Sequence, residues 1–402
     1  MAGVLRISNA RLRGREGAWD ITVEGGKIAK FSRHSARYGA PAFDAAGCLV
    51  TESFVIAHLH LDKVRTAERA SAEALARYQE GRMDTRRSIA LASEVKKGYS
   101  RNEIIARARR AVEESLEYGV THMRAFADTD TKSRLEAVKA LMVLREEFKG
   151  RVEIQVVAFP QEGIEADPGA EEYVERAIEL GADVVGGIPW LERSEDRQRR
   201  HIDKMFAIAK RHDRHLAMLV DDAGDAKLKT LEMLASKTIK EKWFGKVEAC
   251  HARAMQLYSD RYARRVAGLC ATAGIGVVSS PHTGPLHTSI DVLRRAGVTV
   301  ALGQDDCSDA YYPYGRCDML EVAFLASHLL RKMGPEETEE LYDMITVGPA
   351  KIIGVGGFGL KVGNPANLVV LGQRTVREAF AYHERPRLVV SHGNAVGRQP
   401  YD

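Results

Sequence analysis

The chain has 402 residues, 45% of them hydrophobic and 28% charged, which excludes disordered, collagen-like and repeat-biased proteins. Lys and Arg number 59 against 55 Asp and Glu, so the net charge of +4 provides no overall attraction to nucleic acid or anionic membranes. Five scattered cysteines without a CxxC pair, and a charged N-terminus, favour a reduced cytoplasmic protein. No apolar run is long enough for a membrane span.

Short strand-like runs occur at both ends of the chain. They are Val4–Ile7, Ile21–Val23, Lys27–Phe31, Asn367–Leu371 and Leu388–Ser391. Together they predict one small β-domain built from both termini, with residues 1–53 and 355–402.

Between these terminal parts, apolar runs alternate with amphipathic helical stretches. The runs are Phe54–His60, Val120–Phe126, Val152–Phe159, Asp183–Gly187, Leu216–Val220, Val247–His251, Gly276–Ser280 and Val298–Leu302. The helical stretches include Glu103–Glu117, Ser133–Phe148, Ala170–Leu180, His201–His212 and Tyr262–Ala273. This α/β alternation predicts a (β/α)8 TIM barrel over residues 54–354, with its chemistry at the carboxyl ends of the strands.

The segment between Lys63 and Asn102 has no strand-like run and predicts a helical excursion after the first barrel strand. Its basic residues could be read as a nucleic-acid patch, but interspersed acids and the low net charge favour a solvated helix face or a subunit contact. These residues are Arg82, Arg86, Arg87, Lys96, Lys97 and Arg101. We therefore expect a homo-oligomer with no nucleic-acid and no membrane partner.

The strongest local signal is His58-Leu59-His60 at the end of the first barrel strand. Residues i and i+2 of a strand project from the same face, so His58 and His60 can converge on one metal ion. Two buried, hydrogen-bonded structural histidines are the alternative. The position at a strand end favours a metal.

Three further polar features follow predicted strands: Asp221-Asp222, His251 and Asp305-Asp306. Each has an ordinary explanation. The Asp221-Asp222 pair could be solvated or cap a loop, His251 could be a structural histidine, and Asp305 or Asp306 could be a helix N-cap. Because all of them fall at carboxyl ends of barrel strands together with the histidine pair, they predict a one-metal hydrolytic site. The GxGxxG match at 354–359 follows a helical stretch and opens no helix, so no dinucleotide site is expected there.

With these residues in view, the sequence resembles the amidohydrolase superfamily, specifically its cytosine deaminase-like branch. The resemblance covers nearly the whole chain. It rests on the motifs at 54–63, 157–164, 186–189 and 305–315. It implies a (β/α)8 barrel, a β-sandwich from both termini, one Zn or Fe ion, and hydrolysis of a C–N bond in or on a nitrogen-rich ring.

The resemblance also implies roles for individual residues. His58, His60 and Asp305 match the metal ligands, and Asp305 is also expected to accept a proton. His251 matches a sixth-strand histidine that contacts the metal-bound water. No lysine stands at the fourth strand end, where binuclear members carry a bridging lysine, so one metal is expected.

On the substrate side, Gln161 matches the glutamine that reads the amide edge of a pyrimidine or triazine. Asp306 and Tyr311 are also assigned to substrate binding, although Tyr311 stands where cytosine deaminases usually have a tryptophan.

The main departure from the family pattern is at the fifth strand. The pattern there is a histidine, one residue, then Asp-Glu, whereas this chain has Leu219-Val220-Asp221-Asp222. The histidine ligand is replaced by Leu219 and the catalytic glutamate by the shorter Asp222, while His215 lies too far back along the strand to substitute.

The resulting prediction is a metal-dependent hydrolase acting on a small nitrogen heterocycle, with Asp222, His251 and Asp305 as catalytic residues. The alternative is a metal-poor, catalytically weak or silent member that binds a heterocycle without turning it over.

Overall fold

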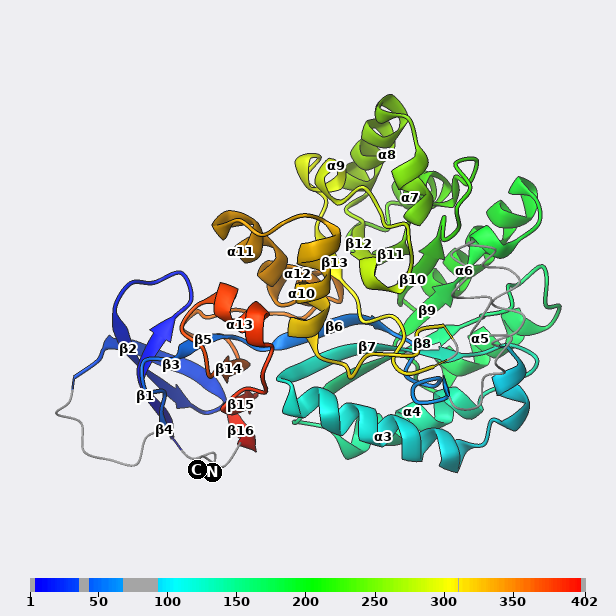
Figure 1. The fold of residues 1–402 in the computed structure, drawn as a ribbon. Coiled ribbons are helices and arrows are strands. Elements are labelled where there is room, and N and C mark those ends of the chain that lie inside the picture. Colours follow the sequence, from blue (N-terminus) through cyan, green and yellow to red (C-terminus); the bar gives the residue numbers. More distant parts are fainter. Residues whose placement is uncertain (1–3, 36–42, 68–92, 310, 399–402) are drawn as a thin grey trace.

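The computed structural model describes residues 4–35, 43–67, 93–309 and 311–398. Figure 1 shows a small β-domain at one end of the molecule, where both termini lie, and a larger barrel of strands and helices beside it. The predicted fold class is therefore confirmed.

The barrel consists of eight parallel strands whose order in the sheet is their order in the chain. They are β6 (Phe54–Leu59), β7 (Val120–Asp128), β8 (Glu153–Phe159), β9 (Val184–Gly187), β10 (His215–Val220), β11 (Val247–His251), β12 (Gly276–Ser279) and β13 (Val300–Leu302). The first and last strands meet where the Asp305 amide donates to the His58 carbonyl at 2.9 Å and the His60 amide donates to the Asp305 carbonyl at 2.8 Å. The barrel thus closes beside the candidate metal ligands.

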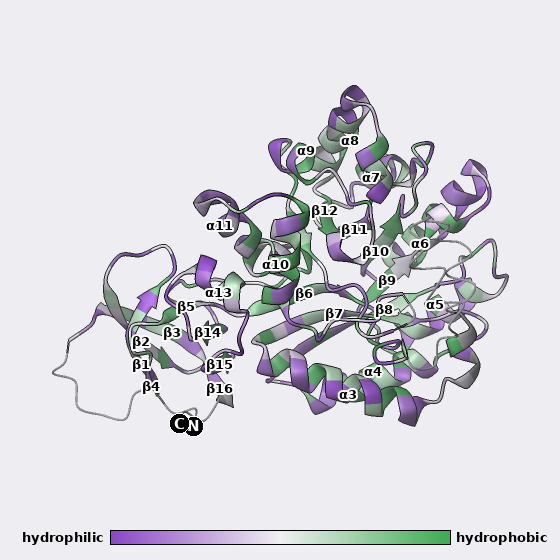
Figure 2. Cartoon of the chain, viewed as in Figure 1, coloured by the Kyte–Doolittle hydropathy of each residue, from purple (hydrophilic) through white to green (hydrophobic). Residues whose placement is uncertain are grey.

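The barrel strands are buried on both faces, as expected of parallel strands covered by helices. All nine residues of β7 are buried, for example. Figure 2 shows hydrophobic colour along the barrel strands and a mixture of hydrophilic and hydrophobic stretches along helix α3. The five cysteines are free and buried, which agrees with the expectation of reduced structural thiols.

Helices connect and cover the strands. They are α3 (Arg101–Glu117), α4 (Glu136–Glu147), α5 (Ala170–Glu179), α6 (Glu195–Arg211), α7 (Thr230–Glu241), α8 (Asp260–Ala273), α9 (Ile290–Arg295), α10 (Met319–Leu329), α11 (Pro335–Asp343), α12 (Val347–Ile352) and α13 (Val376–Tyr382). Short 3-10 turns are η2 (Ser93–Gly98), η3 (Pro189–Leu191), η4 (Arg253–Leu257) and η5 (Pro281–Thr283). None of these helices is long and apolar enough to cross a membrane.

Helix α6 begins six residues earlier than its apolar periodicity predicts. The Ser194 side chain accepts a hydrogen bond from the Arg197 amide at 3.4 Å, and the first turn carries Glu195 and Asp196. Both features stabilise a helix N-terminus. This first turn is too polar to contribute to an apolar stripe, so the periodicity could not reveal it.

The terminal β-domain combines strands from both ends of the chain, as predicted. They are β1 (Leu5–Leu12), β2 (Ala18–Glu24), β3 (Lys27–Arg33), β4 (Phe43–Asp44), β5 (Leu49–Glu52), β14 (Leu368–Val370), β15 (Leu388–Ser391) and β16 (Asn394–Arg398). The hydrogen-bonded order is β16-β15-β14-β5-β1-β2-β3, with β4 paired to β1. Its own apolar core joins Ile7, Ile21 and Ile28 to Leu368 and Val390.

The basic segment after the first strand corrects one expectation. Residues 68–92, with Arg82, Arg86 and Arg87, lie outside the described residues. Lys96 is not on a solvated face, because it is buried and its ammonium group lies 2.7 Å from Asp128 and 3.0 Å from Glu162. Composition suggested exposure, but a lysine can be buried where carboxylates surround it.

Candidate active site

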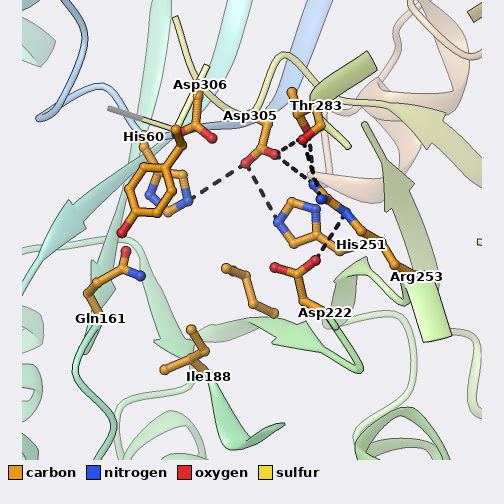
Figure 3. Close-up of a pocket in the computed structure, with 11 residues that line it drawn as sticks. His60, Gln161, Ile188, Asp222, His251, Arg253, Thr283, Asp305 and Asp306 are labelled. Atoms are coloured by element: carbon orange, nitrogen blue, oxygen red, sulfur yellow. Dashed lines mark hydrogen bonds and ion pairs between the residues drawn. The ribbon is translucent and has the colours of Figure 1, made fainter. Parts of the chain in front are cut away.

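The polar residues that follow the predicted strands meet in one pocket at the carboxyl ends of the barrel strands (Figure 3). The pocket contains every sequence-predicted site residue except His58, which contacts it through Asp305. The lining residues are His60, Gln161, Ile188, Leu219, Asp222, His251, Arg253, Thr283, Asp305, Asp306 and Tyr311.

Three imidazoles face one carboxylate oxygen in this pocket. The Nε2 atoms of His58, His251 and His60 lie 3.1, 3.6 and 3.8 Å from Oδ1 of Asp305. The ring of His58 is nearly perpendicular to those of His60 and His251, at interplanar angles of 88° and 87°. Only His58 is within hydrogen-bonding distance of the oxygen, so the other two rings converge on this place without making that bond.

The backbone turns sharply at the strand ends that carry these side chains. Asp221, His251 and Asp305 have φ angles of +46°, +70° and +66°, in the left-handed region that non-glycine residues rarely adopt. Such conformations persist where the surroundings over-determine them, and they concentrate at functional sites.

The second oxygen of Asp305 is held on its other side. Thr283 Oγ1 donates to Oδ2 at 2.8 Å, and Nη2 of Arg253 donates to the same oxygen at 3.3 Å. Burial alone would raise the pKa of Asp305, but His251, the hydrogen bond with His58 and the Arg253 charge hold this pKa well below its ordinary value. Asp305 is therefore an oriented carboxylate whose Oδ1 faces the imidazoles.

Asp222 is the other carboxylate at the centre of the pocket. Nε of Arg253 lies 3.0 Å from its Oδ1, so one guanidinium links Asp222 to Asp305. Burial raises the pKa of Asp222 to about 7, a shift that Asp305 supports and Arg253 opposes. A carboxyl group that titrates near neutral pH can both hold and release a proton under physiological conditions.

The adjacent Asp221 has the capping role that the sequence left open for this pair. Its Oδ1 accepts from the amide and hydroxyl of Thr230 at 2.6 and 2.7 Å, at the first residue of α7. Its Oδ2 accepts from the Tyr258 hydroxyl at 2.8 Å. Of the two aspartates, Asp222 lines the pocket and Asp221 stabilises the loop that carries it.

Behind His60 lies a buried network of charges. The Lys63 ammonium lies 3.4 Å from Nδ1 of His60 and donates to Asp128 at 2.6 Å, and Asp128 also pairs with Lys96. Burial lowers the pKa of His60 well below its ordinary value, and the charge of Lys63 lowers it further. Burial also lowers the pKa of His251 well below its ordinary value. Both imidazoles are therefore neutral at physiological pH, the form in which histidine binds metals.

Gln161, Asp306 and Tyr311 give the pocket unused hydrogen-bonding capacity. Oε1 of Gln161 and the hydroxyl of Tyr311 are buried and have no hydrogen-bond partner among the described residues. Burial, and then the neighbouring Asp305, raise the pKa of Asp306 well above its ordinary value. These groups can read the polar edge of a flat ligand, while Ile188 offers an apolar surface in the same pocket.

The donor set fits a divalent transition-metal ion. Imidazole nitrogens and carboxylate oxygens are ligands that zinc and iron accept, and three imidazole nitrogens here lie around one carboxylate oxygen. Tetrahedral zinc with bonds of about 2.0–2.2 Å separates its ligand atoms by roughly 3.3–3.5 Å. The 3.1–3.8 Å separations from Oδ1 of Asp305 bracket this value.

Arg253 and Thr283 are pocket residues that the sequence analysis missed. Arg253 begins η4 two residues after His251, and Thr283 ends η5 directly after β12. Extending the strand-end rule to the seventh strand would have found Thr283. Nothing in the sequence distinguishes Arg253 from the chain's many surface arginines. The GxGxxG match at 354–359 lies in a loop after α12 and opens no helix, as predicted.

Comparisons with known proteins agree with this architecture. A model described as "Amidohydrolase family" matches residues 42–396. The N-isopropylammelide isopropyl amidohydrolase of Pseudomonas sp. (strain ADP) is 26% identical over 393 residues, covering 98% of this chain and 96% of that protein. The structure of 5-methylcytosine deaminase from Klebsiella pneumoniae with 5-fluorocytosine has a TM-score of 0.91 at 29% identity, covering 99% of this chain and 98% of the other. N-isopropylammelide isopropylaminohydrolase from Burkholderia multivorans ATCC 17616 has a TM-score of 0.85 at 29% identity, with 98% coverage of each chain.

Proposed function

Because the chain belongs to the amidohydrolase family, in its cytosine deaminase-like branch, we propose that it is a metal-dependent hydrolase cleaving a C–N bond of a small nitrogen heterocycle such as a pyrimidine or triazine. The observation that carries the proposal is the convergence of the Nε2 atoms of His58, His60 and His251 on Oδ1 of Asp305. A purely structural role would not require three imidazoles around one buried carboxylate.

His58, His60 and Asp305 would hold one divalent ion, zinc or iron. When bound, such an ion acts as a Lewis acid that activates water for attack near neutral pH. Oδ2 of Asp305 is occupied by Thr283 and Arg253, so its Oδ1 is the oxygen that faces the reacting centre.

Proton transfer is assigned to the two central carboxylates. Asp305, an oriented carboxylate, accepts the proton of the attacking water, and Asp222 delivers a proton to the departing nitrogen. The pKa of Asp222 near 7 suits this second task, because a fraction of the group is protonated at neutral pH. Arg253 keeps both carboxylates in place through its separate contacts.

Substrate recognition is assigned to Gln161, Asp306 and Tyr311. The amide group of Gln161 can pair with the donor–acceptor edge of a cyclic amide or amidine, since its Oε1 has no partner among the described residues. Asp306, whose raised pKa favours the protonated form, can donate to a ring nitrogen or carbonyl, and Tyr311 lines the same pocket.

The test is a turnover screen on metal-loaded protein. Zinc- and iron-loaded samples are incubated with pyrimidines, N-alkylated triazines and pterins, and released ammonia, amines and ring-opened products are quantified. Chelator-stripped protein is the control. Release of any such product only by the metal-loaded protein supports the proposal. Binding of these heterocycles without any product would instead favour the catalytically silent alternative.

A further inference from the structure

The fifth strand offers no metal donor where the family pattern has one. Leu219, on β10, lines the pocket with a hydrocarbon side chain. Its neighbour Asp222 is not free to move inward, because Nε of Arg253 lies 3.0 Å from its Oδ1. With His58, His60 and Asp305 alone, the site would hold an ion through three protein ligands.

The adjacent sixth strand supplies the missing donor. Nε2 of His251 lies 3.6 Å from Oδ1 of Asp305, as close as the 3.8 Å of His60, and His58, His251 and Asp305 present ligand atoms within 4.8 Å of one another. We infer that His251 is a direct metal ligand that replaces the fifth-strand histidine lost at Leu219. This inference rests on the proposed function, because it presupposes that the site holds a metal.

The backbone keeps His251 in this place. β10 and β11 run parallel with Val220 beside His251. After the left-handed turn at His251, the Ala252 amide donates to the Val220 carbonyl at 3.0 Å and the Ala254 amide to the Asp221 carbonyl at 2.9 Å. These bonds tie the end of the sixth strand to the end of the fifth, so the imidazole of one strand can occupy the ligand position of the other.

The replacement changes the role of His251 and leaves that of Arg253 as it was. As a ligand, His251 is no longer available for the contact with the attacking water that the family resemblance implies. The cation that remains beside the reacting centre is Arg253, which bridges Asp222 and Asp305. Arg253 is therefore a positioning residue that fixes both carboxylates.

Metal binding without substrate tests the inference directly. Chelator-stripped native protein and His251→Asn are titrated with Zn²⁺ in competition with a chromogenic chelator, and with Co²⁺ while its visible spectrum is recorded. Loss of groups that only support a ligand costs 10–100-fold in affinity, so loss of a ligand is expected to weaken Zn²⁺ binding by about 100-fold or more. The Co²⁺ bands are expected to shift with the changed ligand set.

Two variants sharpen this result. His122→Asn removes a buried imidazole of β7 that is outside the pocket, and it should leave the affinity unchanged. Leu219→His combined with His251→Asn returns the donor to the fifth strand, and it should recover the affinity to within about tenfold of native. Circular dichroism establishes that each variant is folded.

A count of ligands in the native protein requires no variant at all. X-ray absorption of the zinc-loaded protein should show three imidazoles, whereas two would overturn the inference. Unchanged affinity and an unchanged Co²⁺ spectrum in folded His251→Asn would also overturn it, while leaving the proposed function intact. Native protein that binds neither Zn²⁺ nor Co²⁺ would overturn both.

Discussion

Asp305 illustrates how two oxygens of one side chain take different tasks. Oδ2 is held by Thr283 and Arg253, and Oδ1 faces the three imidazoles. Asp305 stands at a strand end, yet it is only 4% exposed. Burial lowers the local dielectric around the carboxylate, which strengthens each of its contacts.

Asp305→Asn is expected to lower turnover by about 10²–10⁴-fold, because the amide neither accepts the proton nor binds a metal well. The shape of the side chain is conserved, so the fold should survive. Steady-state rates and thermal unfolding of native and variant protein check this. Near-native turnover in a folded variant would remove Asp305 from the chemistry.

At the scale of elements, the pocket depends on how closely β8 and β9 pack. A Cβ atom at Gly186 would lie 2.6 Å from the Ala158 carbonyl oxygen and 2.9 Å from Cα of Phe159. Both are backbone atoms of β8, so the strands would have to separate. The Phe159 ring lies 5.3 Å from that of His60, which connects this strand pair to the site.

Gly186→Ala is therefore expected to lower the free energy of unfolding by about 1–3 kcal/mol and to impair activity. The matched control is Gly268→Ala in α8, where an added Cβ meets nothing within 4 Å. A helix-interior alanine should raise stability by about 0.5–1 kcal/mol. Urea unfolding measures both. A Gly186→Ala protein as stable as native would show that β8 and β9 tolerate separation.

At the scale of the whole molecule, Arg13 joins the terminal β-domain to the barrel. It follows β1, and its guanidinium donates to Glu339 and Asp343 of α11 at 2.7 Å each while lying 4.6 Å from the centre of the Tyr342 ring. Residues more than 300 positions apart in the chain thus meet through one side chain.

Arg13→Ala is expected to lower the free energy of unfolding by about 1–2 kcal/mol, since the contacts are half-buried. Arg11→Ala, at an exposed position of β1, is the control and should change stability by less than about 0.5 kcal/mol. Equal effects of the two substitutions in urea unfolding would contradict the role of Arg13.

The boundary between the terminal β-domain and the barrel, where His122 of β7 lies against His392, also predicts a pH dependence of the free energy of unfolding. Burial, and then the neighbouring His392, lower the pKa of His122 to about 3. In the unfolded chain this histidine titrates near pH 6.5, so between pH 6.5 and about 3 the unfolded state binds a proton that the folded state does not. The contribution of His122 to the free energy of unfolding is therefore complete above pH 6.5. It is lost as the pH falls toward 3, by up to about 1.4 kcal/mol per pH unit.

Unfolding free energies at pH 7.5 and 5.0 should therefore differ less in His122→Asn than in native protein. His328→Asn, which removes an exposed imidazole of α10, serves as the control and should keep the native difference. A native-like difference in His122→Asn would show that this histidine does not contribute to acid sensitivity.

Metal stoichiometry is also a property of the whole molecule. Elemental analysis of metal-loaded protein should give about one ion per chain, because no bridging lysine stands at the fourth strand end. Two ions per chain, found reproducibly, would contradict a mononuclear site.

Three features could be predicted from the sequence: the order of strands and helices, the joining of both termini in one β-domain, and the strand ends that carry His60, Asp222 and Asp305. The elements and strand ends are local features, because hydrophobic periodicity is read from neighbouring residues, and the strand-like runs at both ends of the chain indicate that the termini share one domain. Three further features became visible only in the folded protein: Lys96 is buried, Arg253 bridges two carboxylates, and His251 approaches the metal-ligand position for which Leu219 offers no donor. Those outcomes depend on side chains from different strands meeting across the barrel, and spacing along the chain carries no information about such distances.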